Sequence, residues 1–543
     1  MPQSVPLRRI HYGTSIVVDY WEAKRQLSEL LPRHFLDRGA YRSLADVLHG
    51  RTYDRPTVAS VLEEQNRALG ADAASLANAR RMLDPRSLVV VGGQQAGLFG
   101  GPLYTLHKAL TVLSLAGQLE ADLGCPVVPV FWIASDDHDL AEVACAWVTD
   151  ADGRLRDIGL PGHLAAAPLN RLPVSRVVLG GEVAAAVDQL ADILPAAPFT
   201  TEVLSALRAS YRPTSTFAAA FGTWMHRLLA GTGIVTVDPS DDRLKRIGAP
   251  LFAREIDDPG IVGRAVAEQT ARLAAAGYPA QIDVREGMLT LFLHDPGRTA
   301  IESSGSGLRL SGGRRLAPGE LAGLLEQEPG RFSPNAALRP LFQDTLFPTL
   351  AMVLGPAELA YCAQLAEAYE RLDVPMPVLF PRASLTLLEP RIVRLMTARG
   401  LTLGEAIALG ARLRGEVSRR ALPEGLAARL GQARESAAAA WDGLVGEIDR
   451  LDHSLRRTAE LAAAYTARRF DIVEKKTARA LLRRDAEVAR QAAALEAALV
   501  PRAGLQERTL CAVPFAVRWG MSFPGLVARG MDIWQPDHRG ITI

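Results

Sequence analysis

Four consecutive residues, Asp136-Asp137-His138-Asp139, combine three carboxylates with an imidazole directly after the apolar run Val127–Ile133. Such a cluster is costly to hold together unless its charge is used. It could orient a cationic amine, supply an acid and a base, or bind a metal ion. A helix N-cap would account for one aspartate, but not for four polar groups in a row. We therefore predict Asp136, His138 and Asp139 as catalytic residues, with His138 and Asp139 handling an amine and its proton, and we assign no metal.

A glycine-rich loop, Gly92-Gly-Gln-Gln-Ala-Gly-Leu-Phe-Gly-Gly101, precedes this cluster. Glycine lets backbone N–H groups approach an anion at a helix N-terminus. The loop has Leu98-Phe99 where a Walker loop needs Lys-Ser or Lys-Thr, and its glycine spacing differs from the dinucleotide motif G-x-G-x-x-G. A structural turn between strand and helix is therefore an open alternative, as is a solvated Lys108. The residues predicted to contact a nucleotide or a carboxylate are Gly93, Gln94, Gly97, Gly100 and Lys108.

A second polar set lies around later strand ends, between residues 339 and 382. Helical spacing places Glu358 and Tyr361 on one face near a helix start. Some of these side chains could simply cap helices. The residues of this set that we predict to bind substrate are Arg339, Asp344, Tyr361, Gln364 and Arg382.

The elements that must position these residues follow an alternating pattern. Ser87–Val91 and Val127–Ile133 are short apolar runs, typical of buried parallel strands. Between them, apolar residues recur at helical spacing after Pro102. The crossover of such a βαβ unit is right-handed, so both polar clusters should lie at the carboxyl ends of strands, where open α/β sheets bind ligands. Further strands are predicted at Gly233–Val237, Thr349–Leu354 and Val378–Phe380, and a small antiparallel insertion at residues 278–316.

Length and composition predict a multidomain protein of the cytoplasm. A chain of 543 residues exceeds one small core. Its 61 basic and 60 acidic residues argue against a nucleic-acid partner, and no apolar run is long enough to span a membrane. The four cysteines are too dispersed for a disulfide framework or a cysteine zinc site. We predict a core over residues 1–388 with inserted segments at about 149–200 and 278–330, a helical domain over 389–501, and a C-terminal segment over 502–543 that packs back on the core.

The helical domain should also mediate assembly. Ser454–Leu499 lacks glycine and proline and is predicted to form one long helix. Leu481, Val488 and Leu495 would form an apolar seam on it, which the shorter partner helix at 426–445 cannot cover completely. We therefore predict a homodimer through residues 389–501. Cover by the core domain is the alternative.

Several long stretches together resemble one family. They are Gly93–Thr105 with Pro129–Asp139, Phe332–Thr345, and Gly355–Leu365 with Pro375–Arg382. These stretches are similar to the bacillithiol biosynthesis cysteine-adding enzymes, a family of cysteine ligases. The similarity extends over nearly the whole chain, to Leu505–Arg508 after the helical segment.

This resemblance implies a Rossmann-like parallel-sheet core with inserted connecting segments and a coiled-coil domain that mediates dimerisation. It also implies an amide-forming ligase that adds L-cysteine to the amino group of glucosaminyl-malate, the last step of synthesis of the thiol bacillithiol. Tyr104 and Asn335 lie in the matching stretches and join the predicted substrate-binding residues. ATP or another nucleotide is the expected cofactor. A non-catalytic scaffold of the pathway and a dinucleotide-dependent oxidoreductase are the alternatives.

Overall fold

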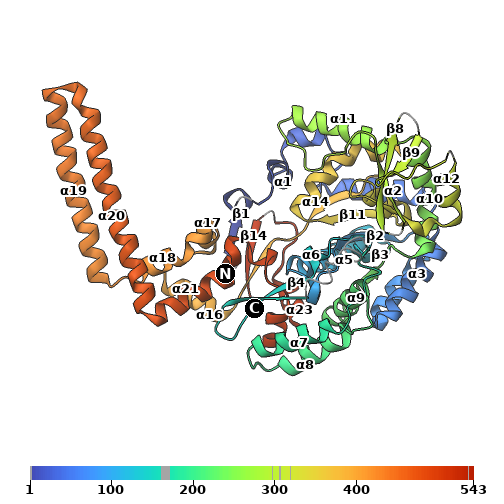
Figure 1. Ribbon diagram of the computed structural model, residues 1–543, viewed down its shortest axis with the longest axis horizontal. Coiled ribbons are helices and arrows are strands. Elements are labelled where there is room, and N and C mark those ends of the chain that lie inside the picture. The colour runs from blue at the N-terminus through green and yellow to red at the C-terminus, as the bar shows by residue number, and fades with distance from the viewer. Residues whose placement is uncertain are drawn as a thin grey trace.

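The computed structural model describes residues 3–10, 12–160, 172–295, 297–304, 307–317, 319–535 and 537–543. Residues 161–171, part of the predicted insertion at 149–200, lie outside these ranges. Figure 1 shows a wide body that carries the sheets and a pair of long helices that projects from it. No helix in the described ranges is long and apolar enough to cross a membrane.

Five parallel strands form the central sheet in the order β12-β11-β2-β3-β6. The order turns back between β2 and β11, as it does in the doubly wound sheets of Rossmann-like folds. The strands are almost fully buried, which explains their continuous apolar sequences. The predicted α/β fold with a parallel sheet is confirmed. The strands are β2 (Leu88–Gln94), β3 (Val127–Ile133), β6 (Val235–Val237), β11 (Thr349–Leu354) and β12 (Val378–Pro381).

Strand β2 continues past its predicted end at Val91, and it takes in two glycines that we had assigned to the loop. Gly92 and Gly93 pair with Phe131 and Trp132 of β3. A Cβ atom on Gly93 would lie 2.7 Å from the carbonyl oxygen of Trp132. These glycines are therefore needed for close packing within the sheet.

Helices connect the strands and pack on the sheet. Helix α5 (Tyr104–Leu123) runs from β2 to β3, contacts both strands, and ends at Gly124, whose φ of +64° is left-handed. Helices α2 (Arg38–His49), α3 (Arg55–Ala68) and α4 (Ala73–Arg81) contact β11, β6 and β3. Other helices of the body are α1 (Ser15–Trp21), α6 (Leu140–Val143), α7 (Glu182–Ile193), α8 (Thr200–Ser210), α9 (Phe217–Leu228), α10 (Asp242–Asp257), α11 (Ile261–Ala275), α12 (Glu320–Gln327), α13 (Arg339–Leu346), α14 (Pro356–Cys362) and α15 (Ala366–Arg371).

An antiparallel sheet of order β10-β7-β8-β9 is inserted between β6 and β11. It confirms the insertion predicted at 278–316 and adds a strand that the sequence did not reveal, β10, which pairs with β7. A separate antiparallel pair, β4 (Cys145–Thr149) and β5 (Leu155–Gly159), follows β3. The inserted strands are β7 (Met288–His294), β8 (Arg298–Ser304), β9 (Gly307–Leu310) and β10 (Phe332–Pro334).

The helical domain differs from its prediction in one respect. The single helix predicted over 454–499 is wrong, because the chain breaks at Asp485 into α20 (Arg456–Arg484) and α21 (Ala486–Leu499). The Asp485 carboxylate accepts hydrogen bonds from the backbone N–H groups of Glu487 and Val488 and so caps α21. The other helices of this domain are α16 (Pro390–Ala398), α17 (Leu403–Leu409), α18 (Leu413–Arg420) and α19 (Glu424–Leu451).

The seam predicted for dimerisation is therefore covered within the chain. Val488 and Leu495 are buried on α21, which packs against α16 and α18. Helix α19 has 28 residues and α20 has 29, so the hairpin partner is not the short helix expected at 426–445. The outer face of the hairpin instead exposes other apolar side chains, among them Leu461, Tyr465 and Val473.

The C-terminal segment returns to the body. Strand β14 (Asp537–Thr542) lies between β1 (Gln3–Pro6) and β13 (Leu385–Leu388) in a three-stranded sheet. Helices α22 (Val513–Trp519) and α23 (Phe523–Gly530) contribute to the main hydrophobic core. Short 3₁₀ turns η9 (Pro501–Ala503) and η10 (Gln506–Arg508) precede them and bring Glu507 into the buried interior.

Candidate active site

A cavity of about 640 Å³ opens at the carboxyl ends of β2 and β11, where the strand order turns back. Gly93 and Gln94 at the end of β2 line it, as does Gly355 directly after β11. Arg298 of β8 and Asn335 after β10 add the inserted sheet to its wall. In open α/β sheets this crevice is the usual ligand site.

Most of the predicted site residues meet in this cavity. Its lining brings together residues from stretches far apart in the sequence, among them the ends of β2, β3 and β11, as expected for a βαβ fold. The predicted residues that line it are Gly93, Gln94, Tyr104, Lys108, Asp136, Asn335, Arg339, Tyr361 and Arg382.

Lys108 lies at the centre of this arrangement. Its side chain is buried, and Nζ donates hydrogen bonds to the carbonyl oxygen of Gly93 at 2.6 Å and to Oε1 of Gln94 at 3.0 Å. It also pairs with Glu358, whose carboxylate accepts the backbone N–H of Gly355 at 2.9 Å. A solvated Lys108 is excluded, because this lysine joins the ends of β2 and β11.

The electrostatics of the pair follow from its burial. Burial lowers the pKa of Lys108, although the nearby Glu358 carboxylate acts against this shift. Burial acts to raise the pKa of Glu358, but the charges of Lys108 and Arg339 outweigh it and the pKa is lowered. Each charge of the pair therefore favours the ionised form of the other, and burial opposes both.

The acidic cluster presents two of its carboxylates to the cavity, those of Asp136 and Asp137. Asp136 pairs with the buried Lys245 at 2.5 Å, so its charge is balanced. Asp137 has no lysine or arginine ion pair among the described residues and accepts a hydrogen bond from Gln95 Nε2 at 2.6 Å. The same amide donates to Glu142 at 2.9 Å, so Gln95 links the carboxylates of Asp137 and Glu142.

His138 and Asp139 lie outside the lining of this cavity, and their catalytic role stays a prediction. Asp139 is the N-cap of α6 and accepts the backbone N–H of Glu142 at 3.2 Å. His138 lies 3.3 Å from Arg298, measured from Nδ1 to Nη1, and can act on the cavity through this guanidinium. Asp137, which faces the cavity, is the better candidate for a proton acceptor.

Arg339 and Tyr361 form another part of the cavity wall. The guanidinium donates to the Tyr361 hydroxyl at 3.1 Å and to Gln343 Oε1 at 3.3 Å. Asn335 supports this wall through its side-chain oxygen, which accepts the backbone N–H groups of Ala337 and Leu338 at the start of α13. The Asn335 side chain therefore holds the turn that leads into α13.

Asp344 and Gln364 do not line the cavity, so their predicted substrate contacts are corrected. Both polar atoms of the Gln364 side-chain amide form hydrogen bonds within the protein. Oε1 accepts the backbone N–H groups of Gln281 and Ile282, and Nε2 donates to the Thr270 hydroxyl and the Ile282 carbonyl. The buried Asp344 accepts the hydroxyl of Tyr369 at 2.6 Å. Each residue stabilises the fold instead.

Asp344 makes stability depend on pH. Burial raises its pKa to about 7, so the folded protein holds a proton that the unfolded chain releases near pH 4. This contribution is complete below pH 4 and is lost as the pH rises to 7, at about 1.4 kcal/mol per pH unit. We expect Asp344→Asn to flatten the decline of unfolding free energy between pH 5 and pH 7 in urea titrations. Equal slopes for Asp344→Asn, the unmodified protein and the exposed control Asp152→Asn would contradict this assignment.

The glycine loop has a packing role at Gly100, one of the positions predicted to contact an anion. The backbone N–H of Gly100 donates to the Tyr211 hydroxyl at 2.9 Å, and a Cβ atom at this position would lie 2.8 Å from Nε1 of Trp224. Gly97 lies outside the main cavity and lines a neighbouring one. Gly100 thus serves packing, and contact of a nucleotide with Gly93 or Gly97 stays a prediction.

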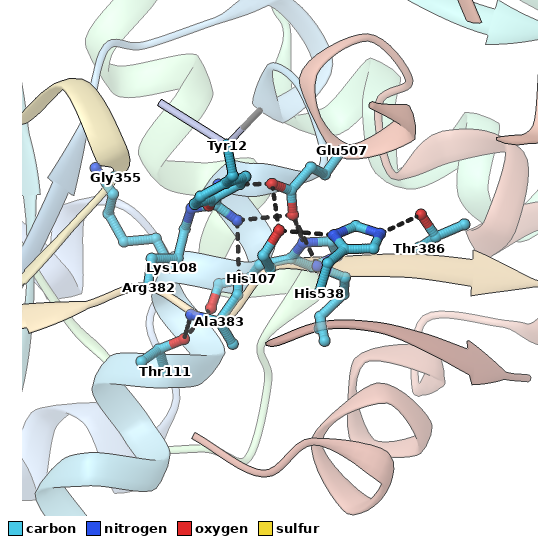
Figure 2. Close-up of polar contacts among 12 residues, drawn as sticks. Tyr12, His107, Lys108, Thr111, Gly355, Arg382, Ala383, Thr386, Glu507 and His538 are labelled. Carbon is cyan, nitrogen blue, oxygen red and sulfur yellow. Dashed lines mark hydrogen bonds and ion pairs between the residues drawn. The ribbon is translucent and has the colours of Figure 1, made fainter. Parts of the chain in front are cut away.

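A buried polar network around Glu507 adjoins the cavity through Arg382, which belongs to both (Figure 2). Both terminal nitrogens of Arg382 donate to Glu507, at 2.8 and 2.9 Å, and one also reaches the Tyr12 hydroxyl at 3.1 Å. Glu507 further accepts the backbone N–H of Leu385 at 2.9 Å and lies 3.2 Å from His107 Nδ1. Burial opposes ionisation of Glu507, but Arg382 outweighs it and holds the pKa well below its usual range.

Sequence reasoning missed several residues of the cavity. Arg298 comes from the inserted sheet, and no local pattern indicated that this strand would reach the core site. Glu358 was noted for its place on a helix, but its pairing with Lys108 depends on the neighbouring strands β2 and β11. The polar and charged side chains of the cavity that were not among the predicted site residues are Gln95, Asp137, Glu142, Arg298, Glu358 and Arg508.

The arrangement is suited to charged substrates. Five cationic and four acidic side chains line the cavity, so it can bind anionic groups and accept a proton from an amine. Within the described residues, no group of three His, Cys, Asp or Glu side chains is placed to hold a metal ion. Cys125, Cys362 and Cys511 are buried and Cys145 is half-buried, and all four are free thiols.

Comparison with known proteins gives a consistent result over the whole chain. Residues 4–383 match the family model described as bacillithiol biosynthesis BshC, N-terminal Rossmann-like domain, and residues 385–542 match the BshC C-terminal coiled-coil domain. Proteins with the name "Putative cysteine ligase BshC" are similar in sequence. That of Koribacter versatilis is 34% identical over 100% of both chains. That of Salinibacter ruber is 33% identical, and the match covers 91% of this chain and 90% of the relative. That of Symbiobacterium thermophilum is 35% identical over 89% of this chain and 88% of the relative.

Proposed function

This chain belongs to the bacillithiol biosynthesis BshC family, and on that premise we propose that it joins the carboxyl group of L-cysteine to the amino group of glucosaminyl-malate. The product amide is bacillithiol, so the reaction is that of a ligase forming a carbon–nitrogen bond. One observation carries the proposal: the cavity where the strand order turns back is lined both by Asp137, a carboxylate with no lysine or arginine ion pair among the described residues, and by five cationic side chains.

Each side of the cavity suits one reactant. The amine must lose a proton to become a nucleophile, and Asp137 is the lining carboxylate placed to accept it. The cysteine carboxylate carries negative charge that increases as the amine attacks, and Lys108 and Arg339 can stabilise it. Gln95 holds Asp137 in position through its side-chain amide.

A carboxylate must be activated before it forms an amide in water. We expect a nucleoside triphosphate such as ATP to supply this activation, with its phosphates near Lys108 and Arg382. The cavity offers cationic side chains for this purpose in place of a glycine-rich phosphate loop. The nucleotide, like location in the cytoplasm, stays a prediction.

The test is a coupled reaction with the purified full-length protein. L-cysteine, glucosaminyl-malate and each of a panel of nucleoside triphosphates are combined, and bacillithiol is detected by mass spectrometry. We expect product with at least one nucleotide, and its loss in Asp137→Asn. Folded protein that forms no bacillithiol with any nucleotide would contradict the proposal. Thiol production in cells that is unchanged by Asp137→Asn would favour the scaffold alternative.

We further propose that the chain forms a homodimer through the α19–α20 hairpin. Leu461 and Tyr465 are four residues apart on α20 and so are neighbours on its surface. Val473 lies about two turns further along, and each of the three apolar side chains is about half exposed or more. Such a patch on a projecting hairpin is typical of a contact with another chain. These residues replace the seam at Leu481, Val488 and Leu495 as the expected interface.

The prediction concerns a triple variant in which Leu461, Tyr465 and Val473 all become glutamate. It should be monomeric by light scattering at micromolar concentration, because three like charges would face the same residues across a two-fold axis. The circular dichroism of the body should be unchanged. Leu83→Glu, a matched change of an exposed leucine on the body, should stay dimeric. A monomeric unmodified protein or a dimeric triple variant would refute the interface.

A further inference from the structure

A second cavity of about 370 Å³ adjoins the main one. Gln94, Gln95, Tyr104, Glu142 and Arg508 line both cavities, so the two spaces adjoin along these side chains. The second cavity is further lined by Arg502 and by residues of β4.

Two guanidinium groups mark this second cavity. Arg502 lies over the ring of Trp147, 4.7 Å from its centroid, and Arg508 lies 6.0 Å from the ring centroid of Tyr12. Neither arginine forms an ion pair within the described residues, whereas Lys108 and Arg382 in the main cavity are each paired with a glutamate. Arg502 and Arg508 are therefore available to an anionic ligand.

The backbone supports this view of Arg502. Arg502 and Ala503 have φ angles of +55° and +62°, a conformation that residues with side chains rarely adopt. Two such residues in succession turn the chain at the point where it leaves the helical domain, and they place Arg502 at the cavity.

The charge balance indicates which ligand fits. Among the described residues that line the second cavity, Glu142 is the one carboxylate, against two guanidinium groups. Arginine binds carboxylates through two parallel hydrogen bonds. Under the proposed function, the amine substrate carries two carboxylates on its malate end, opposite the amino sugar that must reach Asp137 in the main cavity.

We infer that the second cavity binds the dicarboxylate end of the amine substrate, with Arg502 and Arg508 as its carboxylate ligands. This inference rests on the proposed function, because it takes the substrate from it. The amino sugar then lies beside Gln94 and Tyr104, where the two cavities adjoin, and its amine is in the main cavity. A nucleotide phosphate is the competing occupant.

Binding by calorimetry tests the assignment without relying on turnover. We expect Arg502→Gln and Arg508→Gln each to weaken binding of glucosaminyl-malate to the full-length protein by about 10-fold or more, since a hydrogen bond to a charged group is lost. Binding of the methyl glycoside of glucosamine, which lacks the malate, should be the same in the variants and the unmodified protein. Arg457→Gln, a change at an exposed arginine of the hairpin, is the matched control.

Cys145 provides a second readout, because it lines the second cavity and is half-buried while Cys125, Cys362 and Cys511 are buried. Glucosaminyl-malate should slow alkylation of Cys145 by iodoacetamide, whereas the methyl glycoside should not. If the unmodified protein fails to bind glucosaminyl-malate, both the proposed function and this inference are overturned. Equal binding by the unmodified protein and both arginine variants, or protection of Cys145 by ATP alone, overturns only the inference.

Discussion

The Glu507→Ala protein is expected to lose about 3–5 kcal/mol of unfolding free energy, because the substitution leaves the buried guanidinium of Arg382 without its partner. The carboxylate also satisfies the backbone N–H of Leu385, so the loss includes an unpaired buried donor. Urea unfolding followed by tryptophan fluorescence measures the change.

The double variant Arg382→Met/Glu507→Leu separates the pair from general packing. Since it removes both charges together, it should be more stable than Glu507→Ala. A double variant no more stable than that single variant would show that the ion pair does not account for the loss.

The same carboxylate also sets a pH dependence. The pKa of Glu507 is lowered in the folded state, so its contribution is present above the pKa of an unfolded glutamate, about 4.3, and is lost as the pH falls below it. The unmodified protein should therefore lose more stability than Glu507→Gln between pH 5 and pH 3.

The second large effect concerns activity. Lys108→Met should lower kcat/KM for bacillithiol formation by about 10²–10³-fold, the cost typical of losing one positioned group that stabilises developing charge. Lys108 also fixes Gln94 and Glu358 at the cavity, so their orientation is lost with it.

A paired variant distinguishes catalysis from folding. Lys108→Met alone leaves the partner Glu358 without its cation, so some stability is lost as well. Adding Glu358→Gln should restore much of this stability but none of the activity. Recovery of activity in Lys108→Met/Glu358→Gln would contradict a direct role for the lysine.

The parallel strands could be predicted because their signals are local. Val127–Ile133 and Thr349–Leu354 are continuous apolar runs, and the structure shows strands over these same residues. Their order then places Lys108 and Asp136 at one edge of the sheet, as the rule for open α/β folds requires.

The errors arise where a residue's role depends on distant partners. Nothing near Gln364 in the sequence shows that the backbone at 281–282 will occupy its amide. Arg298 belongs to a strand that reaches the cavity only because the inserted sheet folds over it. At Asp485 the sequence does carry a local signal, since an aspartate can cap a helix. It stands, however, within an uninterrupted run of helix-forming residues, which predicts one continuous helix.

The three-stranded sheet has a consequence for how the protein is made. Strand β14 lies between β1 and β13, and Glu507 and His538 complete a network that begins at Tyr12 and His107. Ribosomes release a chain from its N-terminus onward, so Arg382 emerges well before the carboxylate that neutralises it. The body that carries the parallel sheet therefore cannot complete its folding while the hairpin is still being translated, because β14 and Glu507 follow the hairpin in the sequence. A transcript that ends early should therefore yield an unstable product for proteolysis rather than a partly active enzyme.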